Sequence, residues 1–119
     1  MSLHLGQRGE LLALKYLLRQ GYQLSAKNWR YKRAELDLVM TKDQVLIFVE
    51  VKLRKYESFG APESFVDYPK QVRLNRAAQA YCLQKDFQGE IRFDIISIVG
   101  DPDSQYSITH IEDAFFLGI

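Results

Sequence analysis

The chain has 119 residues, of which 47% are hydrophobic and 26% charged, and its formal net charge at pH 7 is +1. These values are typical of a globular protein, and the length suits a single domain, 1–119, built on one core. They exclude a chain that is basic throughout, so any affinity for nucleic acid must come from a local cluster of cations.

Cysteine content and the first residues bear on the cell compartment. Cys82 is the one cysteine, so neither an internal disulfide nor a cysteine-rich metal site can form. The N-terminus lacks the basic and then apolar pattern of a signal peptide. No run approaches the roughly 18 apolar residues of a membrane-spanning helix. We therefore expect a soluble, cytoplasmic protein with no membrane partner.

One helix and three extended segments are predicted in the first half of the chain. Apolar residues at helical spacing predict a helix over 5–20, which Gly21 ends as a C-terminal cap. The stretch 22–32 is aromatic, mixed and irregular, which indicates an extended segment. β-branched and aromatic residues predict strands over 35–41 and 44–53.

The second half of the chain repeats this mixture. Gly, Pro and Ser predict a loop over 54–64. Pro69 suits the first turn of a second helix, which reaches about Lys85. Strands over 91–99 and 105–112 follow. The order α-β-β-β-α-β-β predicts an α/β fold with a mixed central sheet flanked by helices.

Glu10 is an acid at an unexpected place in the first helix. At about 100° per residue, it lies almost opposite the basic residues Arg8 and Lys15 and beside the apolar Ala13 and Leu17. A carboxylate on a buried face favours a functional role. The alternative is that Glu10, near the helix start, satisfies nearby amides and interacts with the helix dipole.

Acidic residues also interrupt the two strands of the predicted hairpin. Side chains alternate along a strand, so Glu35 and Asp37 share one face, as do Glu50 and Lys52. A turn centred on 42–43 pairs Glu35 with Glu50, and a four-residue loop, 42–45, pairs Asp37 with Glu50. Both registers place Asp37 and Glu50 about 5–8 Å apart at Cβ. The intervening apolar residues are expected to share a core face: Leu36, Leu38, Val49 and Val51.

Two interpretations of the charged face remain open from spacing alone. Converging carboxylates repel one another, and a hard divalent cation such as Mg²⁺ relieves that repulsion. A lysine beside the cation could position an attacking water or neutralise a transition state. The alternative is a ladder of surface ion pairs, in which Lys52 pairs with Glu50 or Glu35.

The spacing of Asp37, twelve further residues and then Glu50-Val51-Lys52 resembles the PD-(D/E)XK nuclease signature. A wider pattern comprises GQRGE at 6–10, NWRYKRAELDLV at 28–39, IFVEVKLR at 47–54, FGAPESFVDYPKQVRL at 59–74 and RFDIISI at 92–98. These stretches resemble the YraN-type family of uncharacterised small bacterial proteins. That family is similar to restriction-endonuclease-like enzymes and, in layout, to archaeal Holliday-junction resolvases.

The resemblance implies a Mg²⁺- or Mn²⁺-dependent site that hydrolyses phosphodiester bonds in DNA, including branched or structured DNA. By position, Asp37 and Glu50 match the metal ligands, and Glu10 matches an acid that supports the metal directly or through water. Lys52 matches the catalytic lysine, and the Val51 carbonyl is a further expected ligand.

One residue departs from the family pattern, because Ala34 stands where the family usually has glycine. Glycine adopts positive φ at little cost, whereas alanine does not. The departure therefore puts in question a left-handed backbone at this position, but it removes no catalytic group.

Basic residues cluster on both sides of the proposed site, as phosphate neutralisation requires. On the second helix, Lys70 falls on the apolar face, so it either leans toward the site or extends its charged end into solvent. The residues predicted to contact nucleic acid are Arg30, Lys32, Arg33, Arg54, Lys55, Lys70 and Arg73.

Other polar and aromatic residues favour structural roles. Trp29 and Tyr31 share a strand face, which is more typical of core packing than of base stacking. Arg92 and Asp94 share a strand face and are predicted to form an ion pair. His110 shows no metal-ligand spacing, so we expect no role for it.

The sequence thus predicts a Mg²⁺-dependent nuclease. The alternatives are a non-catalytic nucleic-acid-binding module and a protein-interaction domain on the same fold. Cutting a DNA junction needs two sites, so a homodimer is expected if the substrate is branched.

Overall fold

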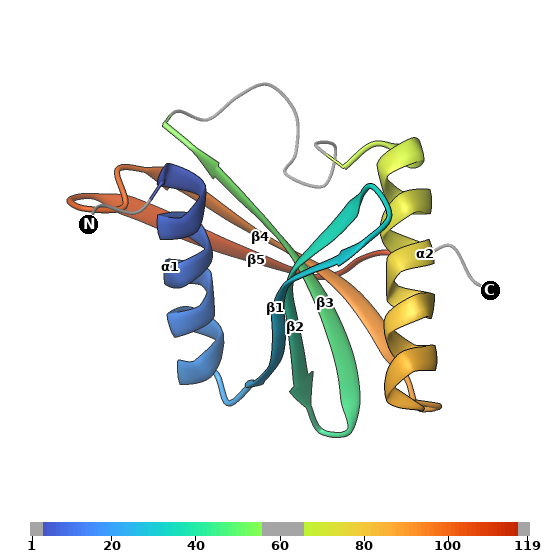
Figure 1. Ribbon diagram of the computed structural model, residues 1–119. Helices are drawn as coiled ribbons and strands as arrows, with labels where there is room; N and C mark the ends of the chain where they lie inside the picture. Colours follow the sequence, from blue (N-terminus) through green and yellow to red (C-terminus); the bar gives the residue numbers. More distant parts are fainter. Residues whose placement is uncertain (1–3, 56–65, 117–119) are drawn as a thin grey trace.

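A computed structural model describes residues 4–55 and 66–116 of the chain (Figure 1). Their order confirms the predicted α-β-β-β-α-β-β arrangement. The predicted loop over 54–64 differs at its start, because Arg54 still belongs to a strand, and 56–64 lies outside the described residues. The elements are α1 (Leu5–Arg19), β1 (Gln23–Tyr31), β2 (Ala34–Lys42), β3 (Val45–Arg54), α2 (Tyr68–Lys85), β4 (Ile91–Gly100) and β5 (Tyr106–Phe115).

The five strands form one sheet in the order β1-β2-β3-β4-β5. The β3–β4 pair is parallel and the other three pairs are antiparallel, so the sheet is mixed as predicted. A parallel pair needs a crossover connection, and α2 lies in it. No helix in the described part of the chain is both long and apolar enough to cross a membrane.

The two helices cover opposite faces of the sheet (Figure 1). This arrangement divides the buried apolar residues into two clusters. The cluster under α1 includes Ala13, Leu17, Leu38, Ile47 and Ile96. The cluster under α2 includes Leu36, Phe48, Leu74, Tyr81 and Phe93.

The β2–β3 turn determines which acids face each other. Asp43 and Gln44 both have positive φ, 51° and 68°, as in the two-residue turns that suit twisted hairpins. The ladder runs from Lys42 opposite Val45 to Leu38 opposite Val49. Continued by one residue, this register sets Asp37 opposite Glu50, which is the second of the two predicted registers. The predicted four-residue loop is wrong, because Lys42 and Val45 still pair and only two residues form the turn.

The predicted common core face is wrong for one residue. Leu38, Val49 and Val51 lie on the α1 side, but Leu36 packs in the α2 cluster. The hairpin of β1 and β2 bends here and curves toward α2 (Figure 1). Because simple alternation assumes a straight strand, it could not place Leu36.

Candidate metal-binding site

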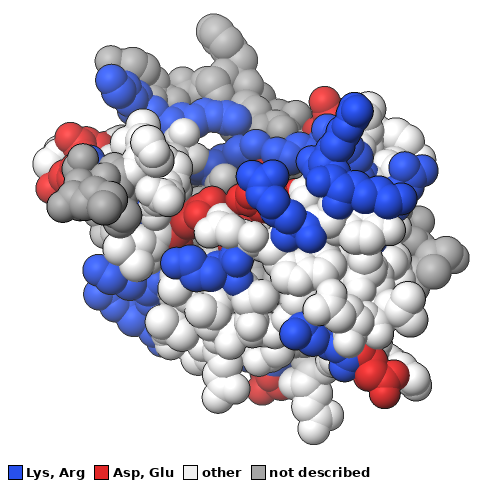
Figure 2. Space-filling view, viewed as in Figure 1, with Lys and Arg blue, Asp and Glu red and all other residues white. Residues whose placement is uncertain are grey.

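The five residues predicted to form the site line a single hollow of about 310 Å³. They come from three elements, the start of α1, the bend of β2 and the outer half of β3. Figure 2 shows acidic side chains recessed in this face, with lysine and arginine side chains gathered around them. The residues are Glu10, Asp37, Glu50, Val51 and Lys52.

Asp37 is half-buried at the bend of β2. Its Oδ2 accepts a hydrogen bond from the Val51 backbone N–H at 2.9 Å. Burial, and then the neighbouring charge of Glu50, raise the pKa of Asp37 to about 7, although the Val51 hydrogen bond opposes that shift. A carboxyl surrounded by other acids is expected to hold its proton to a higher pH, because the neighbouring negative charges oppose its ionisation.

The Val51 carbonyl also lies on the side of β3 that faces Asp37. In an extended strand, the N–H and C=O of one residue point toward the same neighbouring strand. Since the Val51 N–H bonds to Asp37, the carbonyl oxygen of Val51 is directed toward the same acids. The position suits the expected metal ligand.

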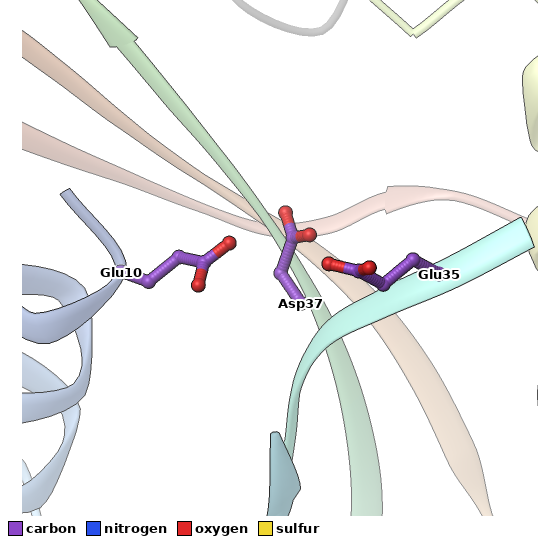
Figure 3. Close-up of side chains that lie close together, drawn as sticks. All are labelled: Glu10, Glu35 and Asp37. Carbon is purple, nitrogen blue, oxygen red and sulfur yellow. The ribbon is translucent and has the colours of Figure 1, made fainter. Parts of the chain in front are cut away.

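Glu10, Glu35 and Asp37 form a compact acidic group. One carboxylate oxygen from each lies within 4.8 Å of the others. Figure 3 shows Glu10 reaching from α1, and Glu35 and Asp37 from β2, toward a common point. Glu10 therefore does not cap its helix. At the start of the helix, the backbone N–H of His4 donates instead to Gln7 Oε1.

Asn28 joins this acidic group and was not found from the sequence. Its Nδ2 donates to Glu10 Oε1 and to Glu35 Oε1, each at 3.0 Å. Its φ of 50° is one that asparagine tolerates better than most residues. The one available signal was a lone asparagine in an extended run. The sequence likewise predicts only the strand face of Glu35 and not a role for it as a ligand.

Glu50 is buried and pairs with two lysines. Lys70 Nζ lies 2.8 Å and Lys52 Nζ 3.4 Å from Glu50 Oε1. Lys70 thus leans toward the site instead of into solvent. The ion-pair alternative is right for Lys52 with Glu50, whereas Glu35 pairs with Arg30 at 2.9 Å. The face therefore holds both an ion-pair network and a compact group of carboxylates.

The two lysines respond oppositely to their surroundings. Burial, together with the neighbouring Lys70, lowers the pKa of Lys52 despite the attraction of Glu50. Burial alone would also lower the pKa of Lys70, but its hydrogen bond to Glu50 and the attraction of Glu50 and Asp37 together outweigh burial and raise it. Lys52 is therefore the lysine that releases its proton more readily.

The other predicted basic residues separate into groups. Arg33, Lys70 and Arg73 line a second hollow, of about 240 Å³, which also contains Asp37 and Glu50. Lys32 does not line this hollow, and its Nζ lies 5.3 Å from the centre of the Tyr31 ring. The remaining predicted residues are Arg30, paired with Glu35, and Arg54 and Lys55 at the end of β3.

The backbone at Ala34 resolves the question raised by the missing glycine. Among the described residues, positive φ in this turn belongs to Lys32, at 54°, and not to Ala34. Ala34 is buried in the α2 cluster, so its methyl group packs without strain.

A second buried polar cluster lies away from the hollow. The predicted ion pair of Arg92 and Asp94 is confirmed, since Nε and Nη2 each donate to the carboxylate at 2.8 Å. The prediction that His110 has no role is wrong, because its Nε2 lies 2.7 Å from Asp94 Oδ2. Trp29 and Tyr31 pack against the α2 cluster, as predicted.

Fold and site together define a small mixed α/β protein with carboxylates and lysines in one hollow. The sequence matches that of the uncharacterised protein family UPF0102 over residues 9–98, and the chain belongs to this family. The predicted resemblance to a family of uncharacterised small proteins is thereby confirmed.

Relatives from several bacteria match along most of their length. A UPF0102 protein of Bacteroides thetaiotaomicron is 42% identical over 112 residues, covering 94% of this chain and 92% of its own. One from Flavobacterium psychrophilum is 38% identical, with coverage of 94% and 93%. One from Pseudomonas savastanoi pv. phaseolicola is 40% identical, with coverage of 92% and 91%.

Proposed function

We propose that the protein is a Mg²⁺- or Mn²⁺-dependent nuclease that hydrolyses phosphodiester bonds in DNA, including branched or structured DNA. One observation carries the proposal, which is that Asp37, Glu50, the Val51 backbone and Lys52 line one hollow. The resemblance to restriction-endonuclease-like enzymes concerns these same positions, so geometry and sequence pattern agree.

The donor atoms suit a hard cation. Carboxylate and carbonyl oxygens are the protein ligands that Mg²⁺ accepts, together with water and phosphate oxygens. Asp37 and Glu50 would hold the ion, with Val51 and Glu10 as further donors. A bound cation lowers the pKa of its water and stabilises negative charge on the phosphate.

Glu50 must exchange a partner for this role. Its Oε1 is held by Lys70 at 2.8 Å, and a cation would compete with that ammonium group. Lys70 then becomes available to a phosphate oxygen in the second hollow, which it lines with Arg33 and Arg73. The exchange keeps the charge of Glu50 compensated throughout, as a buried carboxylate requires.

In this proposal, Lys52 acts on the attacking water. Its lowered pKa favours loss of a proton, so it can hold the water and accept a proton from it. Asp37 retains a proton up to about pH 7 in the metal-free protein. Since a ligand must be deprotonated to bind a cation, metal affinity should fall as the pH falls below 7.

Isothermal titration with MnCl₂ tests the site directly. We expect binding by the unmodified protein and its loss in Asp37→Ala and in Glu50→Ala. Glu90→Gln, which removes one exposed carboxylate, is the matched control and should titrate like the unmodified protein. Unchanged heats in both site variants would refute the metal assignment.

Cleavage is then measured on linear, flapped and four-way DNA and on RNA, with Mn²⁺ present. Metal-dependent cutting that Lys52→Ala reduces by at least 10²-fold supports the nuclease proposal. Binding without cutting of any substrate would favour a non-catalytic nucleic-acid-binding module.

A further inference from the structure

A strongly basic hollow lies beside the metal site. Its volume is about 240 Å³, and its walls come from the turn between β1 and β2 and from one side of α2. Arg73 and Arg76 are three residues apart, so they project from the same side of the helix. The lining contains four cations and no carboxylate, and consists of Tyr31, Lys32, Arg33, Ala34, Arg73 and Arg76.

The arginines of this hollow differ from others in the protein. Arg8, Arg30 and Arg92 each pair with a carboxylate. By contrast, no carboxylate among the described residues pairs with the three arginines that line the hollow, which are Arg33, Arg73 and Arg76. Like charges held together are unfavourable unless an anion neutralises them. The arrangement therefore suits an anionic ligand.

The walls of the hollow are held firmly enough to form a site. Trp29 stacks parallel to Tyr31, with ring centres 6.4 Å apart, and packs edge-on against Tyr81 of α2 at 5.2 Å. These aromatic contacts fasten the β1–β2 hairpin to the helix that carries the two arginines. Binding an anion there requires little ordering of the backbone, which favours affinity.

The basic hollow shares part of its wall with the neighbouring hollow. Arg33, Ala34 and Arg73 line both this hollow and the one that contains Asp37 and Glu50. A single strand of nucleic acid carries a phosphate at every nucleotide. A phosphate at the metal site therefore brings a neighbouring phosphate of the same strand within reach of the basic hollow.

We propose that Arg33, Arg73 and Arg76 form a binding subsite for a backbone phosphate next to the one that is cleaved. The inference rests on the proposed nuclease function for the direction of the strand, but not for the presence of the subsite. Arginine suits the role because its planar group donates two parallel hydrogen bonds to phosphate. The subsite would set where the strand lies relative to the cut.

Arg76 offers the clean test, because it lines the basic hollow and is absent from the lining of both hollows that contain Asp37. Binding of a labelled single-stranded oligodeoxynucleotide is measured by fluorescence anisotropy in EDTA at several salt concentrations. We expect Arg76→Gln to weaken binding about fivefold and to reduce the salt slope by about 0.7, the value for one phosphate contact on a single strand. Arg19→Gln, an exposed arginine at the end of α1, is the matched control.

Inorganic phosphate added to the same assay separates a backbone phosphate from free phosphate as the ligand. We expect it to displace the oligonucleotide only at millimolar concentration. Displacement at micromolar concentration would overturn the proposal, since the hollow would then prefer the free anion. Equal affinities and salt slopes for Arg76→Gln and Arg19→Gln would also overturn it.

The same variants distinguish this inference from the nuclease proposal. If cleavage occurs, Arg76→Gln should raise KM and leave kcat unchanged, because the contact is present before and during the reaction. If the unmodified protein cuts nothing, the nuclease proposal fails while the anisotropy result still decides the subsite. Manganese titration of Arg76→Gln should match the unmodified protein.

Discussion

Replacing Asp37 by asparagine should stabilise the metal-free protein at alkaline pH. The folded protein raises the pKa of Asp37 from 3.8 to about 7, so ionising this group opposes folding. The shift is about 3 pKa units, which corresponds to roughly 4 kcal/mol once the group is fully ionised. Asparagine carries no charge and can still accept the Val51 N–H bond, so the variant avoids this cost.

The sign of the pH dependence follows from proton binding. Between pH 3.8 and about 7 the folded state binds more protons at Asp37 than the unfolded state, so stability falls as the pH rises. The asparagine variant lacks this dependence. Its advantage should therefore grow by about 2.7 kcal/mol between pH 5 and pH 8, at 1.36 kcal/mol per unit.

Urea unfolding at pH 5 and pH 8 in EDTA measures the difference. Glu90→Gln is the control for removal of one negative charge. Saturating Mg²⁺ should stabilise the unmodified protein at pH 8, by about 2.7 kcal/mol at one hundred times its Kd, and leave Asp37→Asn unchanged. An advantage that is the same at both pH values would refute the reasoning.

Three further variants test other contacts. Lys70→Met should lower the free energy of unfolding by about 1–3 kcal/mol, since it removes the closer partner of buried Glu50, and should tighten Mn²⁺ binding in titration by removing a competitor. Asp94→Asn should lower the free energy of unfolding in urea at pH 7 by about 3–5 kcal/mol. The reason is that Asp94 is fully buried and accepts hydrogen bonds from an arginine, a histidine and a backbone N–H. The cost should shrink below pH 3.8: burial alone would raise the Asp94 pKa, but the hydrogen bonds lower it, and protonation removes their contribution. Gly100→Ala should cost about 2 kcal/mol or more by thermal unfolding, since φ is +121° and the added Cβ would lie 2.4 Å from the Gln105 carbonyl oxygen. Stabilities equal to the unmodified protein would contradict each of the three.

Local patterns in the sequence determined the elements and part of the site. Hydrophobic spacing and turn residues predicted the order of helices and strands because each signal lies within one element. Alternation placed Asp37 and Glu50 on one face, and the helical wheel set Glu10 toward the sheet. These inferences needed only the regular geometry of a helix or strand.

The tertiary structure decided what regular geometry cannot express. The bend of β2 at Asp37 moved Leu36 to the opposite core. The bend also lies beside Asn28, whose side-chain amide donates to both Glu10 and Glu35. Asn28 is 18 residues from Glu10 and 7 residues from Glu35 in the sequence.

The contact of Lys70 with Glu50 and the formation of the basic hollow also depend on how separate elements pack. The lysine reaches Glu50 from 20 residues away because α2 crosses the sheet beside β2 and β3. The three arginines of the hollow come from a turn and a helix that are brought together by aromatic contacts. A sequence records the residues available for such a site, but their meeting depends on how separate elements pack, which no local period encodes.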